Sequence, residues 1–273
     1  ASGKDNVAIC GYHGWHDWYL SANHNGGDDL SDHLIPGLSP KGVPKNLKNS
    51  VFPFHYNNYD ELLDIVEKNN IGVIKMEVLR NFGPEDNFLE KVRELATRKN
   101  IVLIFDECSS GFRETFGGIF QKFKVEPDMA MFGKTLGNGY AITAVIGKKS
   151  VMESAQNTFI SSTFWTERIG PSAALSTLKV MEREKSWEKI TETGKKMQKG
   201  WLQLAEANNL DITISGIPAM TTYAFNSKKA LAYKTFITQE MLKKGFLAST
   251  QFYACTKHTN ENLDLYFGAL SDI

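Results

Sequence analysis

The chain has 273 residues, and its 31 basic and 31 acidic side chains cancel to a formal net charge of +0 at pH 7. A balanced charge argues against a general nucleic-acid binder, which carries a basic excess or stripe. No apolar run approaches the roughly 20 residues that a membrane span needs, and the polar N-terminal residues lack the apolar core of a signal peptide. Three scattered cysteines without metal-ligand spacing suit a reducing compartment. We therefore expect a cytoplasmic enzyme or binding protein without a metal site.

The first 150 residues alternate strand-like and helix-like segments. An apolar run at residues 7–10 comes first, and residues 19–48 are rich in Gly, Asp, Asn, Pro and Ser with little periodicity. A stretch this long without regular structure predicts a loop over an active site or at a subunit contact. Apolar residues recur at helical spacing between residues 88 and 99. Buried strands are predicted at residues 71–78, 101–105, 129–132 and 144–146.

Short, almost wholly apolar strands that alternate with helices indicate a parallel sheet covered by helices on its faces, which is an α/β fold. After residue 170 the pattern changes to two helices, the second amphipathic, followed by short strands and two further helices. We therefore expect a large α/β domain over residues 1–170. Residues 171–273 would supply connecting helices and a small α+β domain.

Three features carry candidate chemistry. Asp106 follows a buried strand, at the kind of strand end where ligands of open α/β sheets gather. Lys134 follows another strand and opens a glycine-rich turn at residues 133–139, and Tyr12-His13-Gly14 follows the first apolar run. Taken singly, such an acid is usually a turn or cap residue and such a lysine a solvated cation. Together they match the needs of pyridoxal 5'-phosphate, which requires a lysine amine, a carboxylate at its ring nitrogen, an aromatic face and phosphate donors.

The segment from Asp106 to Lys134 also resembles a known family. Residues 106–113 (DECSSGFR), 127–128 (PD) and 132–134 (FGK) are closely similar to the core pattern of the class III, ornithine- and glutamate-semialdehyde-type aminotransferases. Residues 12–14 (YHG) and 161–164 (SSTF) resemble two further segments of that family. The resemblance extends from about residue 7 to the C-terminus, and the C-terminal part favours the branch of glutamate-1-semialdehyde 2,1-aminomutase.

The resemblance implies a fold and an activity. The fold would be the type I fold of pyridoxal-phosphate-dependent transferases, and the activity would be amino transfer between an amino donor and a carbonyl substrate. Lys134 would form the Schiff base and then move a proton between substrate and cofactor. Asp106 would pair with the ring nitrogen of the cofactor, and the ring of Tyr12 would stack on it.

The resemblance implies further contacts around the cofactor. His13, Glu77 and Arg113 would line the pocket. Thr163 would bind the cofactor phosphate across the interface of a homodimer. The small-molecule amino donor and acceptor would then react at composite active sites, without nucleic acid or membrane as a partner.

Two departures leave alternatives open. Family members bind the phosphate with a Gly-Ser/Thr segment that precedes Tyr-His-Gly, and this chain has none, so it reads as an N-terminally truncated member. Residues 165–171 (WTERIGP) replace a Ser-Gly-Asn-Pro run found in many relatives, which indicates an altered pocket. The alternatives are therefore an aminomutase-type isomerase and a non-catalytic truncated relative. A nucleotide-binding module is a weaker reading because the glycine-rich turn lacks the spacing of a phosphate-binding loop.

Overall fold

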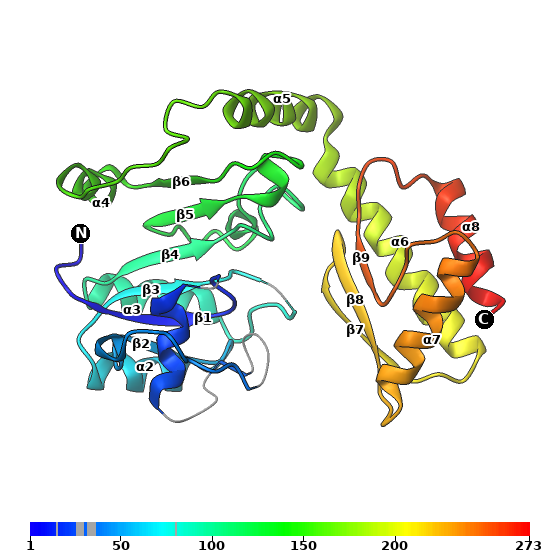
Figure 1. Ribbon diagram of the computed structural model, residues 1–273, viewed down its shortest axis with the longest axis horizontal. Coiled ribbons are helices and arrows are strands. Elements are labelled where there is room, and N and C mark those ends of the chain that lie inside the picture. Colours follow the sequence, from blue (N-terminus) through cyan, green and yellow to red (C-terminus); the bar gives the residue numbers. More distant parts are fainter. Residues whose placement is uncertain (15, 26–29, 32–36, 80) are drawn as a thin grey trace. The chain divides into compact units, whose positions relative to one another are not determined.

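A computed structural model describes residues 1–273 except 15, 26–29, 32–36 and 80, and these residues form two compact units (Figure 1). The first unit comprises Ala1–Val78, Gly83–Gly111 and Gly117–Thr177, and the second comprises Leu79–Phe82, Phe112–Phe116 and Leu178–Ile273. The boundary between residues 177 and 178 lies inside a helix. The expected division after residue 170 stays a prediction.

The first unit is built on a sheet with the strand order β2-β1-β3-β4-β5-β6 in the described part of the chain. Its strands are β1 (Asn6–Cys10), β2 (Val51–Pro53), β3 (Ile71–Met76), β4 (Val102–Asp106), β5 (Met129–Phe132) and β6 (Ala144–Gly147). The β5–β6 pair is antiparallel and the other pairs are parallel. This confirms the predicted α/β class with a mostly parallel sheet.

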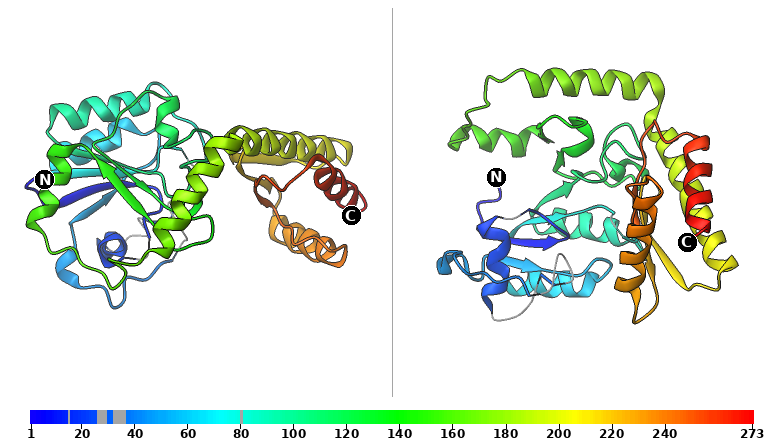
Figure 2. Two further views of the ribbon diagram at one scale, coloured as in Figure 1. Left: turned by 90° about the horizontal axis from the view of Figure 1, so that it is seen from above. Right: turned by 45° about the vertical axis from the view of Figure 1, so that its right-hand side comes forward.

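Helices cover the sheet of the first unit on both faces, which explains why its central strands are apolar along their whole length. Helices α2 and α3 lie on one face and α1 on the other (Figure 2, left). The helices of this unit are α1 (Asp17–Leu20), α2 (Tyr59–Lys68), α3 (Phe88–Arg98), α4 (Lys149–Met152) and the larger part of α5 (Ile169–Glu184). The core is formed by side chains between each face and its helices, such as Ile9 against Tyr19.

Several elements of the structure were not predicted from the sequence, among them β2, α1, α2, α4 and β9 (Gln251–Tyr253). Helix α2 begins at a readable signal, because the side chain of Asn58 caps it by accepting a hydrogen bond from the backbone N–H of Glu61 (3.2 Å). The prediction that residues 19–48 are irregular throughout was also wrong in part. Tyr19 and Ala22, in α1 and the 3₁₀ turn after it, are fully buried because they join the core beside β1. Residues 26–29 and 32–36 of that stretch lie outside the described residues.

The second unit is a three-stranded antiparallel sheet with helices, as expected for its small α+β part. Its elements are α6 (Ser186–Ala207), β7 (Ile212–Ile217), β8 (Met220–Phe225), α7 (Ala230–Lys243), β9 (Gln251–Tyr253) and α8 (Asn260–Ser271). The amphipathic helix α6 contributes Met197 and Trp201 to a core that includes Tyr223 and Leu263. The predicted apolar stripe of this helix is therefore the side that packs on the sheet.

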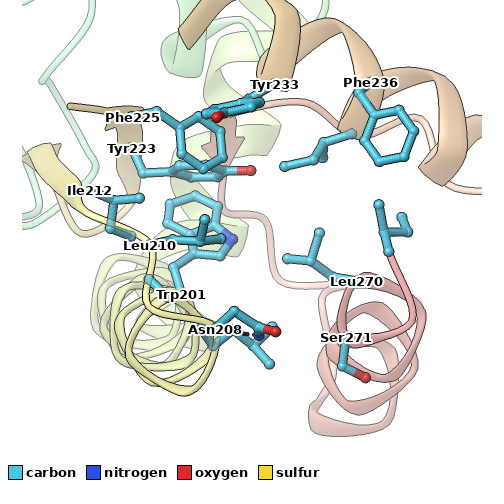
Figure 3. Close-up of a pocket in the computed structure, with 14 residues that line it drawn as sticks. Trp201, Asn208, Leu210, Ile212, Tyr223, Phe225, Tyr233, Phe236, Leu270 and Ser271 are labelled. Carbon is cyan, nitrogen blue, oxygen red and sulfur yellow. Dashed lines mark hydrogen bonds between the residues drawn. The ribbon is translucent and has the colours of Figure 1, made fainter. Parts of the chain in front are cut away.

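The second unit contains an apolar cavity of about 350 Å³, lined by residues of α6, α7, α8 and the sheet (Figure 3). The hydroxyl group of Tyr223 points toward its open centre, and the residue is only 4% exposed. Within the described residues this hydroxyl has no hydrogen-bond partner. The lining contains no lysine, aspartate or glutamate side chain, so the cavity lacks the side chains that the predicted chemistry needs.

We expect Tyr223→Phe to leave the free energy of unfolding unchanged or to raise it by about 1 kcal/mol. A buried hydroxyl without a partner loses its hydration on folding, and removing it removes that cost. Denaturant unfolding of the two proteins, compared at equal m-values, measures the difference. A loss of more than about 1 kcal/mol would show that the hydroxyl is hydrogen-bonded in solution.

Candidate functional site

Most of the predicted site residues of the first unit lie at the carboxyl edge of the parallel sheet. Cys10 at the end of β1 pairs with Met76 of β3, and Asp106 at the end of β4 pairs with Met131 of β5. Parallel strands end at the same edge, so the residues that follow them gather there. Tyr12 and His13 follow β1, Glu77 follows β3, and Lys134 follows β5.

Asp106 is the centre of this cluster. Its Oδ2 atom lies 3.1 Å from Nδ1 of His13 and 2.8 Å from Nζ of Lys75, and its Oδ1 accepts a hydrogen bond from the backbone N–H of Cys108 (3.2 Å). The side chains of Asp106 and Lys75 are each 10% exposed and that of His13 is 0% exposed. The three ionisable groups therefore interact in a largely water-free environment, where Coulomb interactions are stronger than at the surface.

The contacts around Asp106 favour its ionised form. Burial by itself would raise the pKa of the carboxyl group, but the hydrogen bond from His13 and the positive charge of Lys75 outweigh it and hold the pKa well below its usual range. The other ring nitrogen of His13, Nε2, lies 3.0 Å from the carbonyl oxygen of Cys10. Both partners of the imidazole are thus acceptors, so both hydrogen bonds form only when the ring carries two protons.

Glu77 positions the segment that contains Tyr12. Its Oε2 accepts a hydrogen bond from the backbone N–H of Tyr12 (3.2 Å). Gly11 has φ +102°, and a Cβ at this position would overlap the Glu77 carboxylate, so the close approach requires glycine. The Tyr12 ring meets that of Tyr19 edge to face at 6.2 Å. Glu77 therefore acts on the backbone of the loop that presents Tyr12 and His13.

Lys134 stands at the start of a 3₁₀ turn (Lys134–Leu136) directly after β5. Its φ of 38° is a left-handed conformation, which is uncommon for a residue with a Cβ and is held here by the turn. The side chain is exposed, and Nζ donates a hydrogen bond to Oγ of Ser109. The amine is therefore accessible from the carboxyl edge of the sheet.

The Cys108 thiol is influenced by the charges of both Asp106 and Lys134. Burial and the nearby Asp106 carboxylate raise the pKa of the Cys108 thiol to about 11, whereas the positive charge of Lys134 opposes the shift. The thiol is thus protonated at neutral pH and is a poor nucleophile. Among the groups after β4 and β5, the lysine amine is the better candidate for covalent chemistry.

Two predicted residues are not part of this cluster. Thr163 lies on an exposed loop between α4 and α5 of the first unit. Arg113 belongs to the second unit, where its guanidinium group lies 5.8 Å from the centre of the Tyr253 ring and its carbonyl oxygen accepts a hydrogen bond from Thr191 (3.1 Å). The structure therefore brings together Tyr12, His13, Glu77 and Asp106, with Lys134 on the same edge.

The sequence reading did not identify Lys75, Trp18 or Ser109 as site residues. Lys75 had a visible signal, since it is a lone cation inside the apolar run of β3. Trp18 had none, and its ring is placed 5.8 Å from Nζ of Lys75 by the tertiary structure. In the described part of the chain, no three or more His, Cys, Asp or Glu residues are grouped to hold a metal, and no helix is long and apolar enough to cross a membrane.

The sequence is also similar to those of known aminotransferases and aminomutases. The family model for class III aminotransferases matches residues 80–255. The chain is 34% identical to a 3-aminobutyryl-CoA aminotransferase from Cloacimonas acidaminovorans and 29% identical to a glutamate-1-semialdehyde 2,1-aminomutase from Methanococcoides burtonii. These matches cover 96% and 93% of this chain but only 63% and 64% of the two relatives.

The fold agrees with that of solved enzymes of this kind. An omega-transaminase from Sphaerobacter thermophilus superposes with a TM-score of 0.85 at 19% identity, over 99% of this chain and 68% of the other. The family match extends over more than half of the chain, including Asp106, Lys134 and Thr163. The chain is therefore a member of the class III aminotransferase family.

Proposed function

We propose that the protein transfers an amino group between a small amino donor and a carbonyl substrate, with pyridoxal 5'-phosphate held at the site around Asp106. The observation that carries this proposal is the buried, ionised Asp106 carboxylate, which stands at the same sheet edge as the accessible amine of Lys134. Class III aminotransferases use this cofactor. A relative without catalytic function would have no chemical need for both groups.

The residues at the site fit the cofactor. Oδ1 of Asp106 accepts a hydrogen bond from the backbone N–H of Cys108, and because a carboxylate oxygen has two lone pairs, it has capacity for an N–H of the cofactor ring as well. Tyr12 is half-buried and directly precedes His13, which contacts Asp106, so the same loop supplies the aromatic side chain that the cofactor ring needs. When bound, pyridoxal phosphate supplies an electron sink that stabilises negative charge at the substrate carbon.

The side chains of this chain would then divide the work. Asp106 would hold the ring nitrogen and favour its protonated form. Lys134 would bind the cofactor covalently through Nζ. After the substrate displaces it, the same amine would take a proton from the substrate carbon and deliver it to the cofactor. Lys134 has to be neutral for both tasks.

The test of this proposal is covalent capture. The purified protein is mixed with pyridoxal phosphate, treated with borohydride and digested, and the labelled peptide is mapped. We expect one labelled residue, Lys134, because its amine is accessible at the same sheet edge as Asp106. A label spread over surface lysines, or none, would reject the proposed site.

We also propose that the protein is a homodimer in which Thr163 reaches the cofactor phosphate of the partner subunit. The segment that contains Thr163 exposes large apolar side chains, with Phe159 97%, Phe164 74% and Trp165 68% exposed. Apolar patches of this kind mark interaction surfaces. In a two-fold symmetric dimer the same segment would serve both sites.

Mixing two inactive variants tests this arrangement. If Thr163 acts across the interface, a hybrid of a Lys134→Ala subunit and a Thr163→Ala subunit contains one intact site. We expect the mixture, after exchange of subunits, to recover up to about half of the activity of one site per dimer, with each variant alone far weaker. Sedimentation confirms the dimer, and a mixture no more active than its components would place Thr163 elsewhere.

The second candidate is an aminomutase, which moves the amino group within one molecule. The similarity to the glutamate-1-semialdehyde 2,1-aminomutase favours this reading. The two activities use the same cofactor residues and differ in whether the aminated intermediate leaves the site. Turnover of a single substrate without a separate amino donor distinguishes the aminomutase.

We further propose that the protein is cytoplasmic. We also propose that residues 1–170 act as the cofactor-binding domain and that residues 171–273 supply the connecting helices and the small domain.

A further inference from the structure

Lys75 is an unusual residue for its place in the fold. It lies in β3, a central strand, where it pairs with Ile9 of β1 on one side and Ile104 of β4 on the other. It is 8% exposed, and its neighbours along the strand are apolar. A buried ammonium group is costly unless it is paired, so its partner indicates why the strand carries a cation here.

The partner of Lys75 is the carboxylate that is proposed to hold the cofactor. Nζ lies 2.8 Å from Oδ2 of Asp106, and the indole ring of Trp18 lies 5.8 Å away. His13 binds the same Oδ2 atom at 3.1 Å. Two donors thus occupy one oxygen of Asp106, and the other oxygen faces the backbone N–H of Cys108.

We infer that Lys75 is a positioning residue: its ammonium group holds Asp106 by Oδ2, leaves Oδ1 for the ring nitrogen of the cofactor, and weakens the hold of that nitrogen on its proton. This inference rests on the proposed function, because it assumes that Asp106 is the partner of the cofactor ring. In this role Lys75 acts through Asp106 and does not need to contact the substrate.

The physical reason is competition for one negative charge. A carboxylate that neutralises Lys75 and hydrogen-bonds His13 stabilises a third cation less than an unshared carboxylate does. The ionisable groups around the pair are His13 after β1, Glu77 after β3, Glu107 and Cys108 after β4, and Lys134 after β5. Two of these groups are carboxylic acids with partners of their own. Oε2 of Glu77 accepts the backbone N–H of Tyr12 at 3.2 Å, and the Glu107 carboxylate accepts hydrogen bonds from the Ser110 hydroxyl and the backbone N–H of Phe120.

Ring protonation measured by NMR tests the inference. Wild type and variants are loaded with pyridoxal phosphate that carries ¹⁵N in the ring, and the ¹⁵N shift is followed against pH. In Lys75→Met we expect the midpoint of ring protonation to rise by about one pH unit or more, since removal of a nearby cation shifts a pKa by that order. Lys75→Arg keeps the charge and should stay near wild type.

Two further variants make the result unambiguous. Lys68→Met removes an exposed lysine of α2 and should leave the midpoint unchanged. Lys75→Gln, which is neutral and polar, carries the test if the methionine variant fails to fold. An unchanged midpoint in the neutral variants, or an equal rise in Lys75→Arg, overturns the inference.

Asp106→Asn separates failure of this inference from failure of the proposed function. If the midpoint falls in Asp106→Asn but does not move in Lys75→Met, Asp106 is the ring partner and Lys75 has no influence on it. If neither variant moves the midpoint, Asp106 does not contact the ring nitrogen, and the proposed site is rejected together with the role of Lys75.

Discussion

Replacing Lys134 by alanine is expected to abolish covalent capture of pyridoxal phosphate and to lower turnover by at least about 10²-fold, with little change in stability. The amine is the proposed attachment point and the proposed proton carrier, and general acid–base groups alone contribute roughly 10²- to 10⁴-fold. The side chain is exposed and interacts with Ser109, so its loss leaves no buried gap. Borohydride labelling, single-turnover kinetics and denaturant unfolding measure the three effects.

Lys149→Ala is the matched control for this experiment. Lys149 is an exposed lysine of the same unit, at the start of α4, and has no place in the proposed site. The control variant should be labelled at Lys134 as wild type is. Persistence of the label in Lys134→Ala at another single lysine would move the attachment point to that residue, and normal turnover would remove Lys134 from the mechanism.

Replacing Asp106 by asparagine is expected to leave the cofactor bound and to lower turnover by about 10²- to 10³-fold, the range seen when one electrostatic group of an active site is removed. An amide is neutral and no longer favours a protonated ring nitrogen, so the electron sink weakens. The variant also leaves Lys75 and His13 beside an uncharged group. Breaking such a buried pair costs about 3–5 kcal/mol of stability.

Asp128→Asn separates these two effects. Asp128 is also a buried carboxylate with two cationic partners, because it binds Arg93 at 2.9 Å and Lys148 at 2.7 Å, and it accepts the backbone N–H of Leu103 at 2.8 Å. Its substitution should lower stability as well, but leave turnover per folded molecule near wild type. Near-normal turnover in Asp106→Asn, measured on the folded fraction, would contradict the role assigned to Asp106.

The parts of the fold that were predicted correctly share one property, a strong local pattern. The runs around Ile71–Met76, Val102–Asp106 and Met129–Phe132 are buried or half-buried on both faces, so they are almost wholly apolar, which identifies them as strands. Strands β2 and β9 were missed because three residues are too few for a periodic pattern, and β2 contains a proline. Helix α2 had a cap and an apolar stripe that a closer reading would have found.

By itself the sequence determined the residue types that the chemistry needs and the strand ends on which they stand. Asp106 after one apolar run and Lys134 before a glycine-rich turn were readable from the neighbouring residues alone. Only the tertiary structure decided which groups surround Asp106. His13 precedes it by 93 residues, and Lys75 belongs to a strand that reads as apolar. These groups meet because parallel pairing of β1, β3 and β4 brings distant segments into contact, and no local pattern encodes that register.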